Sequence, residues 1–235
     1  MPRLATFIGV EPVVIPPLVR PDRYRTETTR TRVLFVNPVP EKGVDRAFQL
    51  AEVRPDVSFD FVECGPLSSE RRERLLARAR RLSNVAWHRA TSTPRELYRH
   101  ARILLVPSLW EESWGRVVTE AQCSGIPALA SRRGGLPESV GPGGVLVDHD
   151  APVEQWSAAL SGMWDDHGTY EALVASARAH STRPDIQPDR LVERFIVVVA
   201  EHVSRCSRVI GNAKEHEDRQ YPLIRSWARR WRSAW

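Results

Sequence analysis

The chain has 235 residues, of which 42% are hydrophobic and 27% charged, and its formal net charge at pH 7 is +5. No apolar run approaches the ~20 residues of a membrane-spanning helix, and no signal-peptide pattern opens the chain, so we expect a cytoplasmic protein. The three cysteines, Cys64, Cys123 and Cys206, lack metal-type spacing and are odd in number. They therefore predict neither a zinc site nor a disulfide framework, and we expect small buried hydrophobic side chains.

Short β-rich runs alternate with helical patterns along the first 150 residues. The helical patterns are clearest at 43–53 and 69–82, and the predicted strands are residues 33–36, 58–62, 85–88, 103–106, 127–130 and 145–147. This alternation favours right-handed βαβ units in an α/β fold, a Rossmann-like doubly wound parallel sheet. Such sheets bind ligands at the carboxyl ends of their strands.

After residue 150 the strand patterns stop and C-terminal helices are expected at 153–163, 170–179 and 190–206, with a proline-rich turn at 184–188. The last residues place Trp227, Trp231 and Trp235 at four-residue spacing among arginines. This pattern predicts a basic amphipathic helix. We expect it to dock on protein, and peripheral contact with the inner membrane face stays open as the alternative.

The strand at 103–106 leads into a turn of small residues and then a helix. Ser113 and Gly115 mark the opening of this helix, whose unpaired backbone amides attract anions. Glu112 lies before the helix and Glu120 inside it. Carboxylates do not bind phosphate but accept short hydrogen bonds from hydroxyls, such as those of ribose and hexose rings. The arrangement indicates a site for a nucleotide-sugar.

The spacing of Glu112 and Glu120 resembles the Glu-x7-Glu signature of retaining glycosyltransferases with the GT-B fold, in particular glycosyltransferase family 4. The resemblance implies that Glu120 holds the ribose of the donor and that Glu112 faces the transferred sugar. The strand and loop that end at Lys42 and Gly43 resemble the family's lysine-glycine turn, whose lysine meets the donor diphosphate. Residues 124–131 and 134–138 follow the family order, so the resemblance covers roughly residues 11–165.

The resemblance implies a catalytic pair, Lys42 and Glu112. It implies a donor site made of Lys42, Gly43, His88, Glu112, Ser113, Trp114, Gly115 and Glu120. His88 falls where the family's third strand meets its base-binding loop, and an ordinary surface loop is the alternative there. One departure concerns charge, because the family often carries an arginine a few residues before the lysine and this loop reads Asn37-Pro38-Val39. Arg116, Arg132 and Arg133 lie near the motif and are candidates to supply the missing positive charge, but they are not assigned to the site.

A complete GT-B enzyme has two Rossmann-like domains, and the resemblance concerns the second, donor-binding one. We expect an interdomain-type connector at 1–30, a nucleotide-sugar-binding domain at 31–165, C-terminal helices at 166–215 and the basic tail at 216–235. The implied reaction is transfer of a sugar from a nucleotide diphosphate with retention of configuration, without metal or cofactor. A separate chain is expected to supply the acceptor-binding domain. The alternative is a truncated, non-catalytic nucleotide-binding or interaction module.

Other chemistries are less well supported by the sequence. Asp148 and Asp150 have a spacing that binds metal-diphosphate in a different transferase fold, but Asp150 is better explained as a helix cap. Neither a Gly-x-Gly-x-x-Gly fingerprint nor a Walker loop occurs. The arginines of residues 70–81 are interleaved with glutamates, which indicates a solvated helix face and no nucleic-acid partner.

Overall fold

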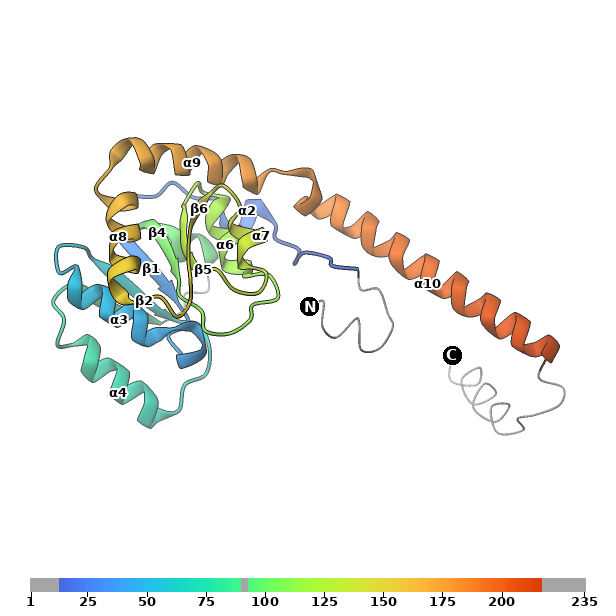
Figure 1. Ribbon diagram of the computed structural model, residues 1–235, viewed down its shortest axis with the longest axis horizontal. Helices are drawn as coiled ribbons and strands as arrows, with labels where there is room; N and C mark the ends of the chain where they lie inside the picture. Colours follow the sequence, from blue (N-terminus) through green and yellow to red (C-terminus); the bar gives the residue numbers. More distant parts are fainter. Residues whose placement is uncertain (1–12, 90–92, 217–235) are drawn as a thin grey trace. The chain divides into compact units, whose positions relative to one another are not determined.

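The computed structural model describes residues 13–89 and 93–216, and in the last helix it describes side chains only at 188–201 and 203. The chain divides into two compact units, residues 1–190 and 191–235. The first unit holds a six-stranded parallel sheet with helices on both faces (Figure 1). The predicted α/β class and doubly wound sheet are therefore confirmed.

The sheet has the strand order β3-β2-β1-β4-β5-β6. Its strands are β1 (Arg32–Val36), β2 (Phe59–Glu63), β3 (Val85–Arg89), β4 (Ala101–Val106), β5 (Ala128–Ser131) and β6 (Gly144–Val147). All six lie at nearly the predicted positions, since runs of aliphatic and aromatic residues are typical of strands buried on both faces. The strand order reverses direction between β1 and β4, where Leu34 pairs with Leu104.

Two hydrophobic clusters cover the two faces of the sheet. One cluster packs α3 (Val44–Val53), α4 (Ser69–Ala79) and α8 (Val153–Trp164) against side chains such as Phe35 and Phe61. The other packs α2 (Pro21–Tyr24), α5 (Pro94–Tyr98), α6 (Arg116–Gln122) and α7 (Leu136–Val140) against the opposite face, where Leu34 and Leu104 point. Successive residues of a strand thus pack into hydrophobic clusters on opposite faces of the sheet, because side chains alternate along a strand.

Several helices differ from their predicted extent. The helix predicted at 69–82 begins after Ser68, whose hydroxyl accepts a hydrogen bond from the amide of Arg71 at 3.3 Å, and ends at Ala79. The sequence does not predict α2, α5, α7 or η1 (Pro40–Lys42), because helices of three to five residues show no recognisable helical period. After α8 come α9 (His167–Ser181) and η2 (Pro184–Ile186), close to the predicted helix and turn.

The predicted capping role of Asp150 is wrong. The N-cap position of α8 is Pro152, with φ −63° and ψ 158°, so the helix starts at Val153, three residues after Asp150. Proline has its φ already fixed near the value needed at a helix start, and no side-chain cap accompanies it here. The neighbouring Asp148 pairs instead with Arg132, with 3.2 Å between carboxylate oxygen and guanidinium nitrogen.

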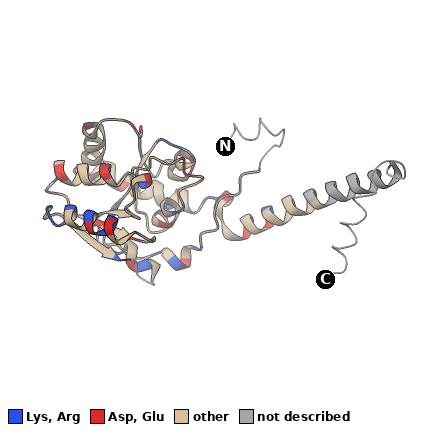
Figure 2. Cartoon of the chain, turned by 90° about the horizontal axis from the view of Figure 1, so that it is seen from below, with Lys and Arg blue, Asp and Glu red and all other residues tan. Residues whose placement is uncertain are grey.

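The second unit begins within α10 (Pro188–His216), which confirms a helix at 190–206. Its described side chains include an exposed apolar set, Val192, Phe195, Ile196, Val197, Val199 and Val203. Figure 2 shows uncharged residues predominating along the described part of α10. Trp227, Trp231 and Trp235 of the predicted tail lie outside the described residues. Within the described ranges, no helix has the length and apolarity needed to cross a membrane.

The loops after β1 and β4 touch through their backbones. Gly43 has a left-handed φ of +77°, and a Cβ at this position would lie 1.9 Å from the carbonyl oxygen of Pro107. In addition, the amide of Leu109 donates to the carbonyl of Glu41 at 2.9 Å. Only glycine fits here, and the contact fixes the end of the lysine loop against the loop that follows β4.

Replacing Gly43 with alanine should therefore destabilise the fold. We expect Gly43→Ala to lower the free energy of unfolding by about 2–4 kcal/mol, from left-handed strain and the backbone collision together. Denaturant-induced unfolding measures this. The matched control is Gly162→Ala in α8, where nothing lies within 4 Å of the added Cβ and a gain of about 0.5–1 kcal/mol is expected. Equal changes in the free energy of unfolding for Gly43→Ala and Gly162→Ala would contradict the proposed role of the contact between Gly43 and Pro107.

Candidate functional site

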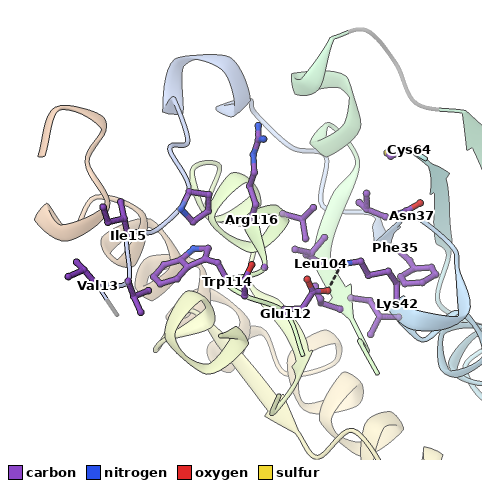
Figure 3. Close-up of a pocket in the computed structure, with 18 residues that line it drawn as sticks. Val13, Ile15, Phe35, Asn37, Lys42, Cys64, Leu104, Glu112, Trp114 and Arg116 are labelled. Atoms are coloured by element: carbon purple, nitrogen blue, oxygen red, sulfur yellow. Dashed lines mark hydrogen bonds and ion pairs between the residues drawn. The ribbon is translucent and has the colours of Figure 1, made fainter. Parts of the chain in front are cut away.

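A pocket of about 730 Å³ opens at the carboxyl ends of β1 and β4. Figure 3 shows Val13, Ile15 and Trp114 on one side of it and Phe35 and Lys42 on the opposite side. The polar groups that line it are Asn37, Lys42, Cys64, Glu112, Ser113 and Arg116. The pocket thus occupies the point where the strand order reverses, the usual ligand crevice of a doubly wound sheet.

Lys42 and Glu112 meet in this pocket as an ion pair between the ammonium and Oε1 (Figure 3). The side chain of Glu112 is 12% exposed and that of Lys42 is 33% exposed. The buried hydroxyl of Ser108 donates to the same carboxylate oxygen at 2.8 Å, and the amide of Gly135 donates to the Glu112 carbonyl at 2.6 Å. The two predicted catalytic residues, 70 positions apart, are therefore in direct contact within the pocket.

Free backbone donors lie beside this pair, at the start of α6. Gly115 has φ +84°, and a Cβ there would lie 2.5 Å from Leu136, so only glycine fits this turn. Within the described ranges, the amides of Ser113, Trp114 and Gly115 donate no hydrogen bond. The Trp114 ring is buried, and its indole N–H donates to Thr119 at 3.0 Å. Three amides at a pocket wall are suited to the oxygens of an anion.

Glu120 lies buried behind the pocket wall. Its Oε2 accepts a hydrogen bond from the Tyr98 hydroxyl at 2.7 Å, and its Oε1 pairs with the Nε of Arg116 at 2.6 Å. Arg116 lines the pocket and also donates to the hydroxyl of Tyr24 in α2. The second glutamate of the motif does not line the pocket itself, whereas its partner Arg116 does.

His88 and Gly43, also predicted for the donor site, do not line this pocket. The ring nitrogen Nε2 of His88 lies 2.8 Å from Asp60, which also pairs with Arg32 at 2.6 Å. Asp60 is on the neighbouring strand β2, so this contact depends on strand pairing that no local pattern reveals. Gly43 acts through its backbone, since its amide donates to Pro40 and its carbon abuts Pro107.

Three polar pocket residues are not identified as site residues by the sequence. Asn37, which stands in the loop that departs from the family pattern, has φ +62°, and its side-chain oxygen is buried without a hydrogen-bond partner. Cys64 follows β2 and also lines the pocket. Arg116 has the i,i+4 spacing to Glu120 that favours an ion pair on a helix, and this spacing is the signal that could have identified it.

Burial controls the protonation of three groups at or near this site. Loss of water around its sulfur atom raises the pKa of the Cys64 thiol, although the residue as a whole is exposed, and the charges of Glu120 and Glu63 raise that pKa further. Burial raises the pKa of Cys123 to about 11. Burial and the charge of Glu120 hold the pKa of Tyr98 well above its usual value. Tyr98 therefore keeps its proton, and its hydroxyl donates a hydrogen bond to the carboxylate of Glu120.

The strand order and this crevice place the chain in the class of Rossmann-like domains, which bind nucleotides at the switch point of the sheet. Residues 21–180 match the family model described as glycosyl transferases group 1. The match covers more than half of the chain, and the chain belongs to this family. The family resemblance seen in the sequence is confirmed.

Curated relatives support the same membership. The D-inositol 3-phosphate glycosyltransferase of Paenarthrobacter aurescens is 31% identical over 175 residues, which are 69% of this chain and 41% of that protein. The enzyme of the same name from Corynebacterium kroppenstedtii is 42% identical over 89 residues, 37% of this chain and 19% of that protein. The chain thus spans less than half the length of these relatives.

Solved structures share the fold. Anabaena Alr3699/HepE, crystallised with UDP and glucose, has a TM-score of 0.69 at 17% identity and covers 80% of this chain, which corresponds to 57% of that one. WaaG, a glycosyltransferase involved in lipopolysaccharide biosynthesis, has a TM-score of 0.64 at 21% identity. The match covers 79% of this chain and 57% of WaaG. At these identities the likeness establishes the fold, which is half of the GT-B architecture.

The raised thiol pKa values predict slow, pH-dependent modification of the cysteines. In a Cys206→Ser background, we expect Cys64 to react with a thiol reagent faster than Cys123, because Cys64 is exposed and Cys123 is buried. The rate at Cys64 should still be rising between about pH 9 and pH 10, where the rate of an ordinary thiol levels off, since a raised pKa delays formation of the thiolate. Mass spectrometry of timed samples measures both rates. A rate that is already constant by about pH 9 would contradict the raised pKa of Cys64, and Cys64→Ser is the control.

Proposed function

We propose that this chain is the donor-binding domain of a retaining, nucleotide-sugar-dependent hexosyltransferase. The observation that carries the proposal is the meeting of Lys42 and Glu112 beside three free amides in the switch-point pocket. A cation and backbone donors are suited to a diphosphate, while carboxylates are suited to sugar hydroxyls. The pocket volume of about 730 Å³ is within the usual range for ligands of this size.

In the proposed complex, Lys42 and the amides of Ser113 to Gly115 receive the diphosphate. The lysine ammonium has three donors, so it is able to keep its hydrogen bond to Glu112 while donating to a phosphate oxygen. Glu112 then faces the transferred sugar. Glu120 accepts a hydrogen bond from a ribose hydroxyl after the Arg116 side chain leaves its ion pair with Glu120. A donor of this type is supported by Anabaena Alr3699/HepE, which shares the fold and was crystallised in complex with UDP and glucose.

The proposed chemistry is electrostatic. The bond from the anomeric carbon to the diphosphate oxygen breaks as a bond to the acceptor oxygen forms on the same face of the sugar, and the leaving phosphate takes the acceptor's proton. Lys42 and the free amides stabilise the charge that develops on the departing diphosphate. The proposal requires neither a metal nor another cofactor.

The matched Paenarthrobacter relative extends well beyond the region shared with this chain, since 41% of it is covered. Sugar transfer would also require an acceptor-binding domain, and we propose a cytoplasmic setting, with residues 216–235 as a candidate peripheral contact at the inner membrane face. The acceptor in the relatives' names, D-inositol 3-phosphate, is not assigned to this chain, because the site residues proposed here are donor contacts. The competing function is a non-catalytic nucleotide-binding module, which would bind donors without transferring sugar.

Calorimetric titration with uridine, guanosine and adenosine diphosphate sugars tests the donor site. We expect one class to bind without added metal, and Lys42→Ala and Glu120→Ala each to weaken that binding by about tenfold or more, because each removes a charged partner of the ligand. Glu70→Ala is the matched control, since Glu70 is an exposed carboxylate on α4. Wild-type affinity in both site variants would overturn the site assignment.

A further inference from the structure

The two oxygens of the Glu120 carboxylate have partners of very different accessibility. The hydroxyl of Tyr98 holds Oε2, and Tyr98 is 0% exposed. The guanidinium of Arg116 holds Oε1, and the Arg116 side chain is 57% exposed. The two contacts are similar in length, at 2.7 and 2.6 Å, so accessibility is what separates them.

Accessibility decides which of the two contacts is exchangeable. An exposed guanidinium that leaves a carboxylate regains hydrogen bonds from water, so the exchange costs little on the arginine's side. The buried carboxylate oxygen still needs a donor, and a ribose hydroxyl is able to replace the arginine there. A buried hydroxyl that loses its acceptor finds no replacement, and breaking that hydrogen bond bears the full desolvation cost. Oε2 is therefore held permanently, whereas Oε1 is able to change partners.

The surroundings of Tyr98 reinforce this fixed contact. Its ring packs edge-to-face against Tyr24, with centroids 6.4 Å apart and an interplanar angle of 71°. The Tyr24 hydroxyl in turn accepts a hydrogen bond from Arg116. The raised pKa of Tyr98 keeps its hydroxyl a donor over the working pH range. The tyrosine ring is thus immobilised on one side of the carboxylate, and the exposed arginine lies on the other.

We propose that Tyr98 is a positioning residue for nucleotide recognition, which fixes Oε2 of Glu120 so that Oε1 is the oxygen offered to a ribose hydroxyl when Arg116 withdraws. The inference rests on the proposed function and deepens it. According to this inference, the hydrogen bond from Tyr98 to Glu120, which does not contact the ligand, determines how strongly ribose is preferred over a sugar that lacks the 2′ and 3′ hydroxyls. Tyr98 lies on α5, 22 residues before Glu120, and contacts it only through the tertiary fold.

The test compares two ligands and three proteins. The ligands are the nucleoside diphosphate that the wild-type chain binds best among those of uridine, guanosine and adenosine, and its 2′,3′-dideoxy analogue. The proteins are the wild type, Tyr98→Phe, which removes one oxygen and keeps the buried ring, and Tyr170→Phe. Tyr170 is a buried tyrosine on α9 whose hydroxyl donates to the Arg102 carbonyl at 3.4 Å, away from Glu120.

We expect the wild type and Tyr170→Phe to share one preference for the ribose form, and Tyr98→Phe to reduce that preference by about tenfold, the effect of one hydrogen bond to a charged group. Binding of the dideoxy analogue should be unchanged by Tyr98→Phe. Equal weakening of both ligands would show general loosening of the pocket and overturn the inference, as would a preference that survives in Tyr98→Phe. If the wild type binds no nucleotide, the proposed function itself fails, and the inference fails with it. Binding without a ribose preference would leave a donor site but remove the role of Glu120.

Discussion

β1 and β4 pair in parallel at the centre of the sheet, and the helices that follow them, α3 and α6, lie on opposite faces. Because the chain departs in opposite directions at this point, the two loops separate above the strand ends and leave the crevice that becomes the pocket. The close approach of Gly43 to Pro107 limits how far they separate. The positions of Lys42 and Glu112 both follow from this pairing, since each lies in one of the two loops.

The two glutamates of the motif are stabilised in the same way. Each is largely buried, and each has one buried hydroxyl partner and one more exposed cation: Ser108 and Lys42 for Glu112, Tyr98 and Arg116 for Glu120. A buried carboxylate needs such partners, because an unpaired charge is costly away from water. The cations are the accessible members of each pair, so they are the ones free to turn toward an anionic ligand.

Much of the fold and part of the site are predictable from the sequence. The six strands are found because buried parallel strands are continuous apolar runs, and Glu112, Ser113, Gly115 and Lys42 are found because each lies in a local motif. The family resemblance places His88 at the end of the third strand and implies a donor-site residue, but its side chain pairs with Asp60. The place of Asp150 between a strand and Ala151-Pro152 predicts a cap, but Pro152 itself occupies the N-cap position. Both predictions depend on neighbours that local spacing does not specify.

The sequence by itself determined the α/β class, the family and the residues that carry charge near the strand ends, because these depend on periodicity and on motifs within a few residues. Only the tertiary structure decided which groups meet. It places Lys42 against Glu112, 70 residues away in the sequence, and pairs Arg116 with Glu120. It also places Tyr98, from a helix too short to be predicted, in hydrogen-bond contact with Glu120. The physical reason is that strand order and helix packing set these contacts, and a buried carboxylate takes as partners whichever donors that packing places beside it.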